Sequence, residues 1–142
     1  MPAPTANIEM LQTVVGTILT EHGSLKHYAR KLVDKLHGIQ PIGQTVLVYL
    51  LPMPEKKNDI IIPDAASSVN EPTYRLGLIL RLGELKSYMV NHELVVPARP
   101  ASIQTGSVIM FPGYGNIPVL GSSDYLIVNE ANIVAAWPCN TL

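Results

Sequence analysis

Apolar positions in the first forty residues recur at helical spacing and predict two helices. The first helix is marked by an apolar face made of Ile8, Leu11, Val15, Ile18 and Leu19. Thr5 or Asn7 can cap its start, and Gly23 interrupts the pattern before Ser24, which can cap a second helix. The second helix carries the apolar stripe Leu25, Tyr28, Leu32 and Leu36, with Gly38 as a C-cap. Residues 1–40 are therefore expected to form a helical hairpin with one apolar side.

From Pro41 onward the pattern changes to short runs rich in β-branched residues. The expected strands are Gln44–Leu51, Tyr74–Leu82, Ser107–Phe111, Tyr125–Val128 and Ile133–Trp137. Proline, glycine, asparagine and serine separate these runs, and the chain holds 12 prolines and 10 glycines. Short strands at this spacing predict a small β-barrel or sandwich over residues 41–142.

The polar segment from Pro52 to Thr73 contains three consecutive isoleucines, Ile60, Ile61 and Ile62. A connection longer than about 15 residues inside a compact domain is usually functional or disordered. Burying one isoleucine is worth roughly 1.5–3 kcal/mol, so leaving three in water would be costly. The pattern alone also fits a buried strand of an ordinary hairpin.

Composition and charge exclude several classes of protein. The chain has 142 residues, of which 47% are hydrophobic and 15% charged, and its formal net charge is -1. This balance argues against a nucleic-acid-binding protein or a polybasic membrane binder, since both need a dense positive field. The single Cys139 rules out an intramolecular disulfide. No apolar stretch approaches the roughly 18–20 residues of a membrane span, and the N-terminus lacks a signal-peptide pattern, so a cytoplasmic location is expected.

Residues that could carry catalysis or hold a metal are scattered. His22, His27 and His37 are not at the i, i+4 spacing of a helical metal site, and His92 is remote in sequence. Ser122 and Asp124 fit a turn better than a nucleophile and its base. We therefore expect no enzyme, no metal and no cofactor.

A series of motifs nevertheless follows a recognisable order. The series is Pro41-Ile-Gly-Gln-Thr-Val-Leu-Val48, Ile60-Ile-Ile-Pro-Asp64, Gly77-Leu-Ile-Leu-Arg-Leu-Gly83, Gly106-Ser-Val-Ile-Met-Phe111, Gly113-Tyr-Gly115, Tyr125-Leu-Ile-Val-Asn-Glu130 and Asn132-Ile-Val-Ala-Ala136. In this order and spacing the chain resembles the small co-chaperonin (GroES) family over residues 41–137.

The resemblance implies an irregular β-barrel that forms a homoheptameric ring and caps a large ATP-driven chaperonin, closing the chamber that holds unfolded client proteins. ATP would be bound by the partner. By position, the family's mobile loop falls on residues 52–73, and its chaperonin-binding tripeptide on Ile60, Ile61 and Ile62. The roof loop falls on residues 84–97, and Tyr114 takes the place of a cavity-facing tyrosine. The family's ring contacts imply a subunit interface made by Val46, Val48, Ile133 and Val134.

Several departures from the family pattern predict a divergent member of the family. One interpretation of these departures is a virus-encoded protein that acts in the cytoplasm of a host cell. The helical extension is absent from ordinary members, and the roof segment Leu85–Val90 is more apolar than usual. The extension could pack on its own barrel, clamp a neighbouring subunit or bind a client. As an alternative, the chain could be a structural or assembly protein, such as a virion component, that has the same barrel and binds mainly through its helical hairpin.

Overall fold

The computed structural model describes residues 8–51 and 74–138. Two helices come first, α1 (Ile8–His22) and α2 (Leu25–Lys35), as the spacing predicted. Ser24 is the N-cap of α2, where its hydroxyl accepts a hydrogen bond of 3.0 Å from the His27 N–H. The caps predicted for the first helix, Thr5 and Asn7, lie outside the described residues.

The end of α2 differs slightly from the predicted glycine cap. His37 is the first residue in the left-handed region, with φ 59°, and Gly38 follows with φ 71°. The Gly38 N–H donates to the Val33 carbonyl at 3.0 Å, and the His37 N–H donates to the Asp34 carbonyl at 3.1 Å. These two bonds form a Schellman motif in which histidine occupies the position that usually favours glycine.

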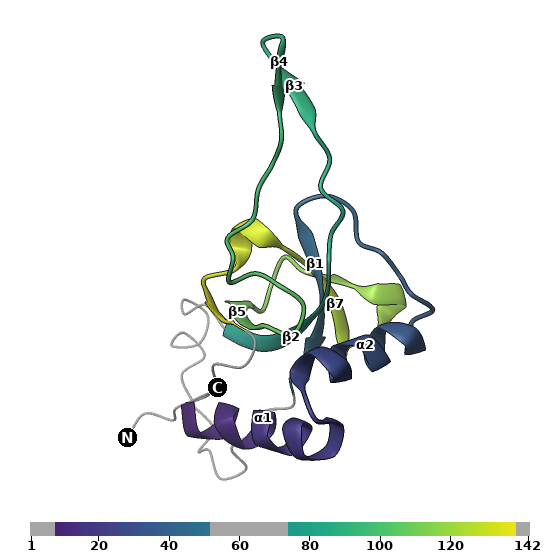
Figure 1. The fold of residues 1–142 in the computed structure, drawn as a ribbon, viewed down its shortest axis with the longest axis vertical. Helices are drawn as coiled ribbons and strands as arrows, with labels where there is room; N and C mark the ends of the chain where they lie inside the picture. The colour runs from purple at the N-terminus through teal and green to yellow at the C-terminus, as the bar shows by residue number, and fades with distance from the viewer. Residues whose placement is uncertain (1–7, 52–73, 139–142) are drawn as a thin grey trace, which may run out of the picture.

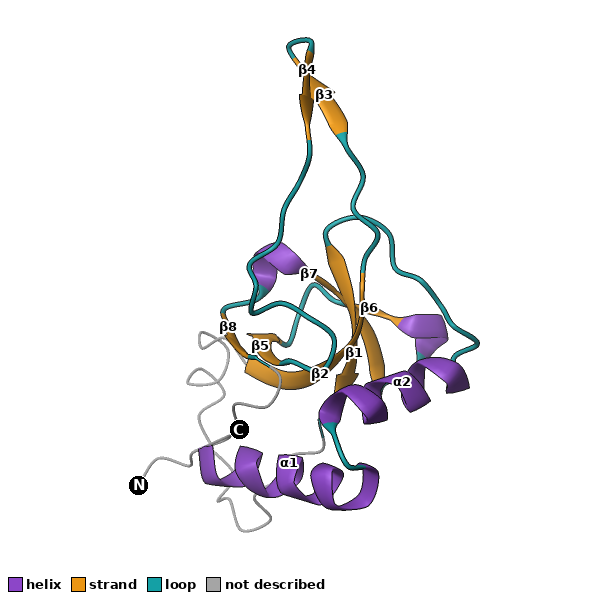
Figure 2. Cartoon of the chain, in the orientation of Figure 1, coloured by secondary structure: helices purple, strands orange, loops and turns teal. Residues whose placement is uncertain are grey.

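The rest of the described chain is mostly β-structure (Figures 1 and 2). The strands are β1 (Thr45–Leu50), β2 (Tyr74–Leu82), β3 (Tyr88–Val90), β4 (Glu93–Val95), β5 (Val108–Pro112), β6 (Ile117–Pro118), β7 (Tyr125–Asn129) and β8 (Ala135–Trp137). Two short 3₁₀ turns, η1 (Val119–Gly121) and η2 (Glu130–Asn132), flank β7. The five predicted strands correspond to β1, β2, β5, β7 and β8, whereas β3, β4 and β6 were not predicted.

Six of the strands form one antiparallel sheet in the order β6-β7-β1-β2-β5-β8. Its two outer strands, β6 and β8, are therefore at opposite edges. The pairing of β1 with β2 shifts register between Leu47 and Val48, and such an irregularity increases the local bend and twist of a strand. The remaining pair, β3 and β4, forms a separate two-stranded hairpin.

Both faces of the central strands are buried, each in its own apolar cluster. The inner cluster contains Val46, Val48, Ile79, Ile103, Ile109, Phe111, Leu126 and Val128. The outer cluster joins residues of the sheet and its connections to residues of the two helices. The first group is Leu47, Leu51, Leu76, Leu78, Leu80, Val108 and Val119, and the second is Leu11, Val15, Ile18, Leu25, Ala29 and Leu32. The helices therefore form a layer on the outside of this chain's own sheet, the first of the three predicted uses of the extension.

Polar contacts hold the connection between α2 and β1 against β2. Arg81 donates through Nη1 to the Gly38 carbonyl at 2.8 Å. Gln40 donates through Nε2 to the Leu82 carbonyl at 2.8 Å. The segment between α2 and β1 is thus hydrogen-bonded to the sheet before β1 begins, and these bonds fix how the helices are connected to the barrel.

Candidate functional site

The predicted roof segment is a hairpin that projects from the barrel, away from the end where α1 lies (Figure 1). We call residues 84–98 the projecting hairpin. Its strands pair Tyr88 with Val95 and Met89 with Leu94. Asn91 and His92 form the turn with φ 51° and 68°, and a two-residue turn with both central residues at positive φ suits the twist of paired strands.

The projecting hairpin exposes large apolar side chains to an unusual degree. The exposed set is Tyr88, Met89, Val90, Leu94 and Val96, each between 45% and 67% exposed. A two-stranded hairpin is at best marginally stable by itself in water. Exposed apolar patches of this kind mark interaction surfaces, so the hairpin is one candidate binding element.

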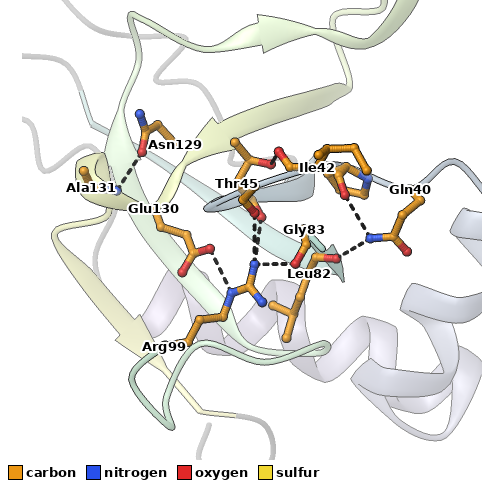
Figure 3. A network of polar contacts seen from close by, with 11 residues as sticks. Gln40, Ile42, Thr45, Leu82, Gly83, Arg99, Asn129, Glu130 and Ala131 are labelled. Carbon is orange, nitrogen blue, oxygen red and sulfur yellow. Dashed lines mark hydrogen bonds and ion pairs between the residues drawn. The ribbon is translucent and has the colours of Figure 1, made fainter. Parts of the chain in front are cut away.

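A buried polar network lies at the base of this hairpin, where the chain leaves the barrel at Gly83 and returns at Arg99 (Figure 3). Arg99 donates through Nε to Glu130 Oε2 at 2.8 Å, and the two side chains are only 13% and 10% exposed. Its Nη2 donates to the Gly83 carbonyl at 2.6 Å and to the Gly43 carbonyl at 3.3 Å. The guanidinium therefore joins three segments that are far apart in sequence.

The expected interface residues fall in two different environments. Val46 and Val48 are 0% exposed and belong to the inner cluster, so their side chains are taken up in the core of the single chain. Ile133 is partly buried against that cluster, and Val134, just before the edge strand β8, is 52% exposed. Ile42, which precedes β1, is 50% exposed. Of these residues, Ile42 before the central strand β1 and Val134 before the edge strand β8 have side chains exposed enough to reach a neighbour.

Tyr114 lies in the turn between β5 and β6 and is 67% exposed. Two apolar side chains follow it at the corner of β6 and η1, Ile117 at 64% and Leu120 at 99% exposed. Leu120 also has φ 49°, a left-handed conformation that costs a residue with a Cβ. Tyr114 is therefore exposed on this chain, and its role as a cavity-facing residue stays a prediction.

An aromatic cluster marks the junction of α1, α2 and β1. His22 stacks on Tyr28 with ring centroids 4.3 Å apart, and Tyr49 lies between Tyr28 and Tyr125 at 6.1 and 5.5 Å. Burial is the main cause that raises the pKa of Tyr28 to about 12, and the proximity of Tyr49 adds to it. Burial likewise raises the pKa of Tyr125. These hydroxyls are neutral at physiological pH. A pocket of about 250 Å³ opens beside Tyr28 and Tyr49.

The described residues hold no cluster of three or more His, Cys, Asp or Glu side chains arranged to bind a metal ion. The Ser122 hydroxyl accepts a hydrogen bond of 3.1 Å from the Asp124 N–H, as the predicted turn requires. Neither α1 nor α2 is long and apolar enough to cross a membrane. What the described surface offers is contact area, with exposed apolar groups at the hairpin and at the sheet edges.

The site predicted from the sequence differs from the described site in two sets of residues. Ile60, Ile61 and Ile62 lie outside the described residues, as does all of 52–73. Arg99 and Glu130 were missed, because an arginine and a glutamate 31 residues apart carry no local pattern. A lone glycine at position 83, closing an apolar strand, was the available hint of close backbone packing.

Comparison with known proteins identifies one family. The family described as "Chaperonin 10 Kd subunit" matches residues 38–137, well over half of the chain. The match begins after α2, so the helical layer lies outside it. The search of curated proteins found no match.

Proposed function

The chain belongs to the chaperonin 10 family, and on that premise we propose that it forms a homoheptameric lid on a large ATP-driven chaperonin. Family membership implies partnership with a chaperonin and oligomerisation in general. The proposal adds the ring of seven, the closure of a chamber that holds unfolded clients, and action in the cytoplasm. ATP would be bound by the chaperonin, and this chain would be no enzyme.

The observation that carries this proposal is the family match, and the position of the hairpin supports it (Figure 1). The matched region contains a sheet with two different edges, Val134 beside one of them, and a hairpin that projects from the barrel. A subunit with two different edges can associate head to tail, which is the arrangement that closes into a ring. The hairpin is then available to form a roof.

Contact with the chaperonin is assigned to Ile60, Ile61 and Ile62, by their position in the family pattern. Burying an isoleucine gains roughly 1.5–3 kcal/mol, while ordering the backbone costs roughly 1–2 kcal/mol per residue. One tripeptide therefore gains little net affinity if several residues must be ordered. Seven tripeptides on one ring bind through a high effective concentration, and the lid can still leave in each cycle.

Sedimentation with a double-ring chaperonin, with and without ATP, tests the proposal. Wild type is expected to co-sediment in a nucleotide-dependent manner, and Ile61→Asp is expected to lose this binding, because seven weakened contacts act together. Asn58→Asp is the matched control, since it adds the same charge three positions away without removing an apolar side chain. Binding that survives Ile61→Asp would refute the assignment of the contact.

The alternative function, a structural or assembly protein that binds through its helical hairpin, has less support. The apolar stripe that would form its binding surface is already used inside the chain, with Leu25 and Leu32 only 3% and 4% exposed. Tyr28 and Leu36 pack against the same outer cluster. We therefore keep the lid as the proposed function.

A further inference from the structure

The projecting hairpin depends on its base for its direction. Its two strands pair with each other in a separate sheet, and neither joins the six-stranded sheet. The apolar side chains along it are largely exposed, so little core packing fixes its orientation. A contact that restrains residues 83 and 99 therefore restrains the whole projecting hairpin.

The base is built from backbone groups that lie unusually close together. A Cβ placed on Gly83 would lie 2.3 Å from the Gly43 carbonyl oxygen and 2.6 Å from that of Thr45. The carbonyls of Gly43 and Gly83 both accept hydrogen bonds from Arg99 Nη2. Oxygens converging in this way favour a cation, and the planar guanidinium can serve several acceptors at once.

Glu130 completes this arrangement from the other side. It lies in η2, directly after β7, and its N–H donates to the Gln44 carbonyl at 3.0 Å. Its carboxylate neutralises Arg99 where the guanidinium is only 13% exposed. Removing one member of such a pair leaves the other charge buried without a partner, which costs far more than the pair contributes.

The same network lies beside the two segments with exposed side chains described above, the one before β1 and the one before β8. Ile42 forms a bridge with Glu84 at the start of the hairpin, and the Gly43 N–H donates to the Glu84 carbonyl at 2.8 Å. On the other side, Glu130 is three residues from Ile133 and four from Val134 in sequence. The hairpin and the segments that carry Ile42 and Val134 are thus all close to one buried cluster.

We infer that Arg99 is a positioning residue for the projecting hairpin. Its ion pair with Glu130 and its bonds to the Gly43 and Gly83 carbonyls set the direction in which the hairpin leaves the barrel. The ion pair also couples that direction to the segment that leads into β8. This inference concerns the isolated protein and does not depend on the proposed binding to a chaperonin.

The test is a distance measurement between the hairpin and the helical layer in the full chain. Spin labels are placed at Met89→Cys, which is 62% exposed, and at Lys31→Cys on α2, in a Cys139→Ser background. Labelled protein is diluted into an excess of unlabelled protein, so that distances within one chain dominate. Glu130→Gln is expected to broaden the distance distribution about two-fold or more, because the buried guanidinium loses its counter-charge.

Two further variants separate positioning from general stability. Glu93→Gln removes a carboxylate from the hairpin itself and should leave the distribution as narrow as in wild type. The double variant Arg99→Gln/Glu130→Gln leaves no buried charge unpaired, so it is expected to fold even if Glu130→Gln does not. It should show a broad distribution while amide exchange in β2 and β5 stays slow. A narrow, wild-type distribution in the folded double variant would overturn the inference.

Discussion

Leu32→Ala tests whether the helical layer and the sheet fold as one unit. Leu32 is 4% exposed and belongs to the outer cluster, which joins α1 and α2 to β1, β2 and β5. The substitution removes three carbon atoms, each worth about 0.8 kcal/mol when buried, so transfer alone predicts a loss of about 2.4 kcal/mol. The cavity left behind raises the expected loss to about 2–5 kcal/mol.

The assay is urea unfolding at a fixed protein concentration, because oligomerisation makes apparent stability depend on concentration. Far-UV circular dichroism reports the helices, and the fluorescence of Trp137 reports β8 at the edge of the sheet. Both signals should shift together to lower urea in Leu32→Ala. Lys31→Ala, on the exposed side of the same helix, should change stability by no more than about 0.5 kcal/mol.

Two results would refute this reasoning. A loss below about 0.5 kcal/mol would mean that Leu32 is not a core residue. A shift seen by circular dichroism but not by Trp137 would mean that the helices unfold independently of the sheet. The second outcome would mean that the two helices are a separately folding extension, which could then contact a neighbouring subunit.

Two further predictions concern single residues. Gly83→Ala should destabilise the protein by about 1–3 kcal/mol, since its Cβ would meet backbone oxygens that cannot move aside. Gly16→Ala, in open space within α1, should instead stabilise it by about 0.5–1 kcal/mol in the same urea unfolding assay. The pKa of Tyr28 is raised from 10.0 to about 12 in the folded state, so between these pH values the unfolded chain releases a proton that the folded chain retains. Titration of Tyr28 should therefore not change stability below pH 10 and should lower it as pH rises towards 12. A urea midpoint that falls equally steeply in Tyr28→Phe would contradict this cause.

The sequence predicted the order of elements well because periodicity reports burial. Both helices and the five main strands follow from spacing, and Ser24 was identified as a cap from its side-chain chemistry. The pattern did not show which partner covers which face. The run Leu76–Leu80 is apolar on both sides, as expected of a strand buried on both faces, and this was the available signal that the helices pack on their own sheet.

The candidate site was less accessible from the sequence. Val46 and Val48 were assigned to an interface by family position. Alternation along β1 turns both side chains into the inner cluster, and the interface itself stays a prediction. The hairpin strands β3 and β4 were not predicted, because their apolar residues stay exposed and carry no burial pattern. Arg99 and Glu130 meet only through tertiary folding, which no local pattern reports.

The two outer strands of the sheet limit how the protein can associate. β6 spans two residues and ends in Pro118, and β8 spans three residues and is followed by Pro138. Short edges and prolines offer few backbone groups to an added strand, a device by which natural sheets avoid indiscriminate aggregation. Any assembly built on these edges must therefore draw its strength from side chains such as Val134 rather than from an extended hydrogen-bonded ladder. Among the described residues, the sheet edges thus offer little template for the strand-by-strand addition that builds open-ended fibrils.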